Sequence, residues 1–198
     1  MTERPDPRIA RTDRALESAI LELAARRPVS GITVADLTEA AGVSRATFYN
    51  RHNSPLELLI GVLDADLDRC HQREERWRAQ TPASPTVTQP SPEKALRLTT
   101  GDVIDHVARF ADVYRQAIDD PADRGVYAAL VQDFADYALE FMALSTSPGI
   151  PVANRPIAAQ FLAHGFAGAI AAWLRDADLT RDDLLDAVVA CAPAWWRR

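Results

Sequence analysis

Residues 33–59 constrain the fold of this chain more than any other part of the sequence. Apolar residues recur at helical spacing over 34–41, and Gly42 follows where a left-handed residue would end that helix. Ser44 is placed to cap a second short helix over 45–51. Two short helices joined by a glycine-containing turn predict a helix-turn-helix.

The rest of the chain is also helical in its apolar period, and no run alternates over strand lengths. The segment 81–92, with four prolines and no apolar periodicity, is expected to be a linker. We therefore predict an all-α fold of about nine helices. The expected helices span 13–27, 34–41, 45–51, 55–79, 93–98, 102–119, 121–144, 154–175 and a last segment from 180 onwards.

Charge and composition limit the class of protein. The 198 residues are 47% hydrophobic and 25% charged, as in ordinary globular proteins, and no uninterrupted apolar run reaches membrane-span length. The N-terminus lacks the apolar core of a secretory signal, so a cytoplasmic location without a membrane partner is expected. The net charge is −6, yet residues 1–54 carry eight arginines against seven acidic residues. This modest asymmetry fits a DNA-reading head on an acidic body.

The second helix of the motif carries side chains that read or grip DNA. Arg45 can bond guanine through two nitrogens, and Asn50 can bond adenine. Ala46 and the methyl group of Thr47 can contact a thymine methyl, while Tyr49 is better placed to donate to a phosphate. These residue types near a helix start predict insertion into a major groove and an operator as the partner.

Three hydroxyl residues, Thr33, Ser44 and Ser54, each stand at a predicted helix start. Capping alone explains them, because a hydroxyl there accepts from a free backbone N–H group. The same position favours a phosphate oxygen, so both roles are kept.

The spacing of these motifs resembles that of the TetR family of one-component regulators. The family pattern is matched by TVADL, AGVS and TFY in register, and the resemblance covers roughly residues 12–62. The chain departs from the pattern where Arg51 and His52 replace His-Phe, where Pro55 replaces a phosphate-binding lysine, and where Ala46 replaces a commoner glycine. Arg51 is the expected substitute for the missing lysine contact.

The resemblance implies an architecture and a mode of regulation. A helix-turn-helix DNA-binding domain is expected at 1–54, and a helical effector-binding and dimerisation domain at 55–198. A dimer would bind a palindromic double-stranded operator, and an unknown small-molecule effector would release it, as in a repressor.

Candidate pocket residues are aromatic or apolar side chains on the inward faces of the body helices. For any one of them, packing in the core without ligand contact is the commoner role. His71, His106 and His164 lie on separate helices, and a metal site is not predicted. The candidates are Leu63, Leu67, Phe110, Tyr114, Tyr127, Phe134 and Tyr137.

Small residues along 154–175 predict a close helix–helix contact, because glycine inside a helix costs about 1 kcal/mol relative to alanine. In the resembled family the last two helices form the dimer interface; packing within one chain would also explain the small residues. The candidates for the dimer interface are Phe161, Gly165, Gly168, Ala169, Ala172, Trp173, Leu184 and Val188.

No pattern typical of an enzyme occurs. The sequence has no nucleophile elbow, no His–Glu pair at metal-ligand spacing and no phosphate-binding glycine loop. We therefore predict a regulator without catalytic residues or a cofactor. The alternative is a ligand-independent DNA-binding adaptor, whose helical body only dimerises or docks a protein partner.

Overall fold

The computed structural model describes residues 7–79, 91–145 and 148–197, and within these ranges the chain is helical with no strand. The all-α prediction is confirmed, and the described part contains nine α-helices and short 3-10 turns. The helices are α1 (Pro7–Ala24), α2 (Val34–Ala41), α3 (Arg45–Tyr49), α4 (Pro55–Ala79), α5 (Pro92–Arg109), α6 (Ala111–Asp119), α7 (Arg124–Leu144), α8 (Arg155–Arg175) and α9 (Arg181–Cys191).

The predicted break between 98 and 102 is wrong, because α5 runs through it without interruption. Gly101 lies buried inside this helix, and its carbonyl accepts a hydrogen bond from the Arg181 guanidinium at 3.2 Å. A Cβ atom at this position would stand only 3.0 Å from Arg181 Nη2. Glycine is therefore used here for close approach, and tertiary packing overrides its weak helix propensity. The chain breaks instead at Phe110, between α5 and α6.

Other boundaries shift less. The first helix begins at Pro7 and ends at Ala24, six residues earlier at its start than the sequence indicated. The predicted linker lies almost entirely outside the described residues, and α5 begins at Pro92.

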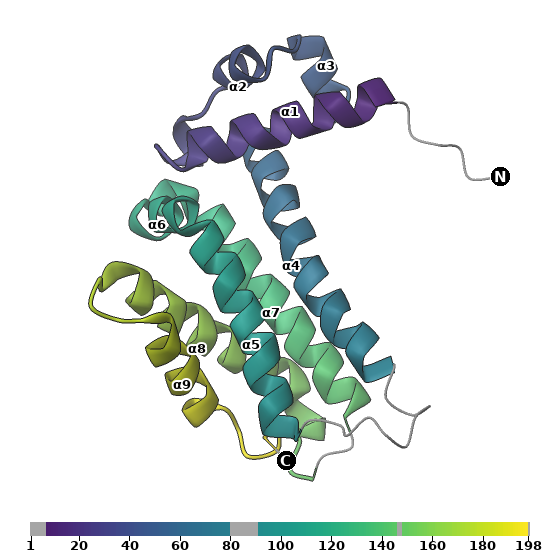
Figure 1. The fold of residues 1–198 in the computed structure, drawn as a ribbon, viewed down its shortest axis with the longest axis vertical. Helices are drawn as coiled ribbons and strands as arrows, with labels where there is room; N and C mark the ends of the chain where they lie inside the picture. Colours follow the sequence, from purple (N-terminus) through teal and green to yellow (C-terminus); the bar gives the residue numbers. More distant parts are fainter. Residues whose placement is uncertain (1–6, 80–90, 146–147, 198) are drawn as a thin grey trace, which may run out of the picture. The chain divides into compact units, whose positions relative to one another are not determined.

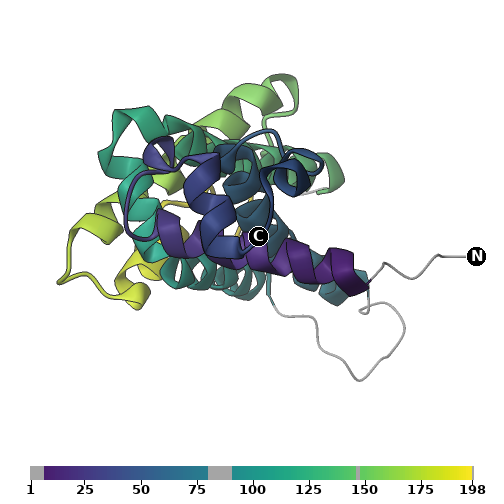
Figure 2. The same ribbon diagram turned by 90° about the horizontal axis from the view of Figure 1, so that it is seen from above.

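The chain divides into two compact units. One, here called the head unit, comprises Met1–Asp64 together with Phe110–Tyr127. It is therefore larger than the predicted domain 1–54, because it takes in the first turns of α4 as well as α6. In the head unit, α2 and α3 lie on the same side of α1 in Figure 1, and Figure 2, seen from above, shows them in front of it. Its core consists of fully buried side chains from these helices, among them Leu16, Ile20, Leu37 and Phe48.

The second, here called the body unit, comprises Ala65–Arg109 and Ala128–Arg198. Helix α9 packs on both α5 and α8. Two ion pairs join α9 to α5: Arg97 with Asp186 at 2.6 Å and Arg181 with Asp105. The C-terminal Trp196 stacks on Phe141 of α7, with ring centroids 4.9 Å apart, so that the tail closes one end of this core.

Candidate nucleic-acid interface and the helical body

The start of α2 is held by a reciprocal cap. The Thr33 hydroxyl accepts from the Asp36 backbone N–H at 3.1 Å, and the Asp36 carboxylate accepts from the Thr33 N–H at 3.0 Å. These bonds from Thr33 hold the pKa of Asp36 below its usual value, and Arg27, paired with Asp36 at 2.8 Å, adds to the effect. The capping role predicted for Thr33 is therefore present, and its side chain is exposed to solvent.

The turn before α3 has the backbone that the sequence predicted. Gly42 adopts φ 65° and ψ 34°, in the left-handed region that suits glycine, and its N–H bonds back to α2. Ser44 then caps α3, because its hydroxyl accepts from the Thr47 N–H at 3.1 Å. The same oxygen lies 2.8 Å from the Thr47 hydroxyl, so two of the proposed contact residues orient each other.

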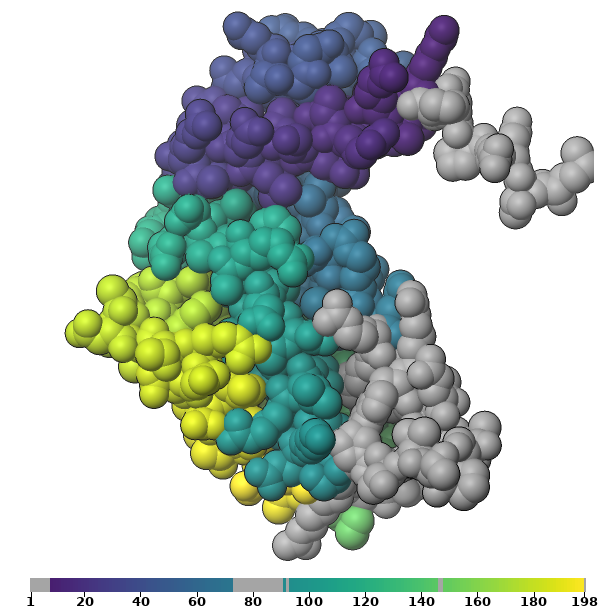
Figure 3. All heavy atoms as spheres, in the orientation of Figure 1, coloured from purple at the N-terminus to yellow at the C-terminus, as the bar shows by residue number. Residues whose placement is uncertain are grey.

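Helix α3 presents polar side chains to solvent on a fixed base. Phe48 is completely buried and anchors the helix to the head core, while Tyr49 is 60% exposed and meets the Phe48 ring edge-on at 5.5 Å. Arg45, Ala46 and Asn50 are exposed. Figure 3 shows the side chains of α2 and α3 forming an outer surface of the head unit. Three of the predicted reading residues are therefore exposed, and the fourth, Thr47, is partly buried.

Arg51 occupies a different setting from its neighbours. It follows the end of α3 and forms an ion pair with Asp13 of α1 at 3.0 Å, with the Arg51 side chain 23% exposed. This contact ties α3 to α1, so a phosphate contact by Arg51 would compete with Asp13. Ser54 accepts from the Glu57 N–H at 3.1 Å and caps the start of α4.

The buried carboxylate of Asp123 supports the helix-turn-helix from outside that motif, and it was not predicted from the sequence. Asp123, 2% exposed, accepts from the backbone N–H groups of Val29, at 2.5 Å, and Ser30, at 2.8 Å. These N–H groups open the 3-10 turn that leads into α2. The partners lie more than 90 positions apart in the chain, so no local pattern signals the contact.

The predicted pocket residues fall into both units. Leu63, Phe110, Tyr114 and Tyr127 belong to the head unit, and Leu67, Phe134 and Tyr137 to the body unit. Tyr114 is only 1% exposed, and Leu63, Leu67 and Phe134 are also buried. Within the body unit, Phe134 stacks on Phe166 at 4.6 Å and Tyr137 stacks on His71 at 4.7 Å. Packing in a core accounts for these contacts.

The body unit also holds a buried ionic network that sequence reasoning missed. His106 is completely buried, and its Nδ1 lies 2.8 Å from the carboxylate of Asp66, which also binds Arg109 at 2.6 Å and Arg69. Burial raises the pKa of Asp66, but the bonds from Arg69 and His106 and the charge of Arg109 outweigh it, so the pKa is lowered. Burial lowers the pKa of His106 despite the attraction of Asp66. Since an ionised carboxylate can only accept, the imidazole donates to Asp66 from Nδ1.

One side of α8 combines exposed apolar side chains with exposed glycines. Phe161 is 78% exposed and Ile157 71%, and Gly165, Gly168 and Ala172 are exposed on the same stretch. No described atom outside the helix lies within 4 Å of a Cβ built on either glycine. Contact within the chain, the alternative explanation of these small residues, therefore does not account for them among the described residues.

The other predicted interface residues are placed differently. Ala169, Trp173 and Val188 are partly buried. Leu184 is 5% exposed and lies in the core of its own subunit, so it is removed from the candidate surface. Its position follows from the packing of α9 between α5 and α8, which its helical phase alone could not reveal.

Comparison with known proteins fits the geometry of the head unit. The sequence profile described as "Bacterial regulatory proteins, tetR family" matches residues 17–60, which contain α2, α3, the last eight residues of α1 and the start of α4. Over this segment the chain is similar to the TetR family. The uncharacterized HTH-type transcriptional regulator YxbF of Bacillus subtilis (strain 168) is 42% identical over 55 residues. That match covers 27% of this chain and 14% of YxbF, so the chain spans only a small part of the length of this relative.

Solved structures share the whole TetR-type fold at low identity. NalD of Pseudomonas aeruginosa, a repressor of the MexAB-OprM multidrug efflux pump, has a TM-score of 0.63 at 20% identity over 92% of this chain and 94% of its own. A tetR-family regulator from Streptomyces coelicolor has a TM-score of 0.58 at 17% identity, over 90% of this chain and 77% of its own. FadR from Bacillus subtilis, solved in complex with stearoyl-CoA, has a TM-score of 0.55 at 14% identity, over 91% of this chain and 99% of its own. At these identities the matches show a shared fold.

Proposed function

We propose that this chain binds a palindromic operator as a homodimer and represses transcription until a small-molecule effector releases it. The observation that carries the proposal is helix α3, whose polar side chains are exposed while Phe48 holds the helix to the head core. Exposed arginine, asparagine and tyrosine beside a capped helix start suit base edges and phosphates. Access to chromosomal DNA implies a cytoplasmic location.

The proposed DNA contact residues all lie in the head unit. Arg45, Ala46, Thr47 and Asn50 are proposed to face base edges, and Tyr49 a phosphate. Thr33, Ser44 and Ser54 already cap helices, and each cap brings free backbone N–H groups to a point where a phosphate oxygen can approach. Arg51 is the weakest member of the set, because Asp13 already pairs with it.

The exposed apolar side of α8 is proposed as the dimer surface. The stretch Val152–Arg175 is also long and apolar enough to cross a membrane, a test that core helices of soluble proteins pass as well, and 33% of its most apolar window is buried. Gln160 and His164 are exposed in the middle of α8. Polar side chains and exposed glycines in the middle of this helix suit the close approach of a second protein helix better than contact with lipid.

A small apolar molecule is the proposed effector class. The structural neighbour FadR was solved with stearoyl-CoA, and NalD regulates a multidrug efflux pump. The pocket candidates of the body unit, Leu67, Phe134 and Tyr137, are apolar or aromatic, which is the lining that such ligands need. In this proposal the effector shifts the population of dimers from a conformation that binds the operator to one that does not, and repression is lost.

The proposal is tested by selecting genomic fragments that bind the purified chain and measuring their affinity by fluorescence anisotropy. The expected result is a palindromic site that binds one dimer, with affinity falling steeply as salt rises. A screen for molecules that both stabilise the protein and release the fragment then tests the effector. Failure to retain any duplex at low salt would refute DNA binding, whereas DNA binding without any releasing ligand would favour the adaptor alternative.

A further inference from the structure

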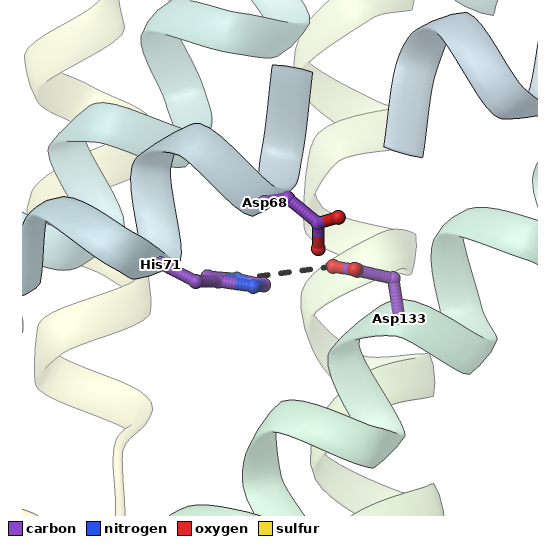
Figure 4. A group of neighbouring side chains, drawn as sticks. All are labelled: Asp68, His71 and Asp133. Carbon is purple, nitrogen blue, oxygen red and sulfur yellow. Dashed lines mark ion pairs between the residues drawn. The ribbon is translucent and has the colours of Figure 1, made fainter. Parts of the chain in front are cut away.

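Two carboxylates and one imidazole come together in the body unit, and the proposed function uses none of them. Asp68 and His71 lie one turn apart on α4, and Asp133 projects toward them from α7 (Figure 4). One ligand atom from each residue lies within 4.8 Å of the others. His71 is far from Asp133 in the sequence, and only the fold brings the two residues together.

The spacing of these atoms suits an ion better than a direct bond. His71 Nε2 lies 3.9 Å from Asp133 Oδ2, which is longer than a hydrogen bond. Two ligands at about 2.1 Å from a tetrahedral ion stand about 3.4 Å apart. A small rotation of either side chain therefore brings both atoms to coordination distance of one ion.

The histidine ring is held in place before any ion binds. It stacks on Tyr137 of α7 with centroids 4.7 Å apart and planes 18° from parallel, and Tyr137 in turn stacks on Trp196 at 6.4 Å. His71 is 17% and Asp133 16% exposed, so both side chains are largely enclosed. Ligands fixed on packed helices lose little conformational entropy on binding a metal.

Charge favours a cation at this place. Asp68 and Asp133 bring two carboxylates within 4.8 Å of each other, where like charges repel, and Asp133 is mostly withdrawn from water. A divalent ion among the three groups offsets that repulsion. Asp68 is exposed, which leaves a route of entry and room for water to complete the coordination.

We propose that Asp68, His71 and Asp133 bind a divalent first-row transition metal ion such as Zn²⁺, Co²⁺ or Mn²⁺. One imidazole with two carboxylates is a donor set for these ions, whereas Mg²⁺ and Ca²⁺ prefer oxygen alone and bind more weakly here. The site goes beyond the proposed function, because it requires neither DNA nor an organic effector.

The test is a titration of the full chain with Co²⁺ and with Zn²⁺, followed by calorimetry and by the visible absorption of bound Co²⁺. A Cys191→Ser background removes the exposed thiol as a competing ligand. Asp133→Asn and Asp68→Asn each remove one carboxylate ligand. Asp136→Asn is the matched control, because Asp136 lies one turn along α7, is exposed and makes the same change of charge.

The expected result is one ion per chain, with affinity lowered about 10-fold or more in both ligand variants and unchanged in the control. The ion should also raise the Tm of the parent protein and not that of Asp68→Asn, whose exposed side chain can change without disturbing the fold. Equal affinities in Asp68→Asn, Asp136→Asn and the parent would overturn the proposal. So would the absence of saturable binding, or Mg²⁺ binding as tightly as Co²⁺.

Discussion

Helices α3 and α8 both expose side chains to solvent, but the chemistry of the two surfaces is opposite. The exposed groups of α3 are the Arg45 guanidinium and the Tyr49 phenol, and the Asn50 amide follows at the C-cap of this five-residue helix, which Phe48 and the Ser44 cap hold in place. On α8 they are Phe161 and Ile157, together with Gly165 and Gly168. No described atom outside the helix lies within 4 Å of a Cβ built on either glycine. Polar groups on a rigid base suit a polar, charged partner, and an apolar face with small residues suits a second protein surface.

The strongest test of this difference is Gly168→Leu on α8. Since a Cβ atom at this position meets no described atom, the leucine fits the single chain and even improves helix propensity by about 1 kcal/mol. If α8 packs on a second copy, the larger side chain separates the subunits, and operator affinity falls about 100-fold or more because two linked heads become single ones. Sedimentation velocity and fluorescence anisotropy measure the two effects.

Gly61→Leu is the matched control for this substitution. Gly61 also lies in a helix interior, is exposed and has no described atom within 4 Å of its Cβ position. The Gly61→Leu substitution should leave the oligomeric state unchanged. A Gly168→Leu protein that sediments as a dimer would remove α8 from the interface.

On the other surface, Arg45→Ala should lower affinity for the operator by about 1–3 kcal/mol. Because a guanidinium reads particular bases, the loss should be confined to certain base pairs of the site. Binding to libraries of single-base variants measures this. An unchanged base preference in Arg45→Ala would mean that Arg45 contacts the backbone only.

The rigidity of α3 can be tested separately from its chemistry. Ser44→Ala removes the side-chain acceptor for the Thr47 N–H and should lower the free energy of unfolding by about 1 kcal/mol, as measured by urea denaturation. Ser44→Asn retains an N-cap acceptor and should restore most of that stability. If both variants bind DNA as the parent does, the cap contributes to folding and not to recognition.

The smallest expected effect belongs to Tyr49→Phe, which removes one exposed hydroxyl and keeps the ring packed against Phe48. A lost phosphate hydrogen bond should weaken binding by at most about 1 kcal/mol. The loss should be equal for specific and unrelated duplexes, as competition anisotropy would reveal. A loss seen only with the specific operator would instead place Tyr49 against a base.

Local structure around the motif was accessible to sequence reasoning because its determinants lie within four residues of each other. The Thr33 and Ser44 caps, the left-handed Gly42 and the start of α4 at Pro55 all follow from residue types in adjacent positions. The same reasoning wrongly predicted a helix break near Gly101. The Arg181 guanidinium that bonds to the Gly101 carbonyl comes from α9, 80 residues away in the chain. Sequence reasoning also failed for Leu184, which fits an exposed face by period but is buried by α5 and α8.

The amino-acid sequence by itself determined the helical class, the helix-turn-helix and the resemblance of this segment to the TetR family, because caps, turns and apolar periods act over short stretches of chain. Only the tertiary structure decided which distant side chains meet. It brought Asp123 beneath the turn before α2, placed Asp66 against His106, and joined Asp133 to Asp68 and His71. Such contacts depend on how packed helices are aligned, and side-chain volumes and charges spread along the whole chain determine that alignment.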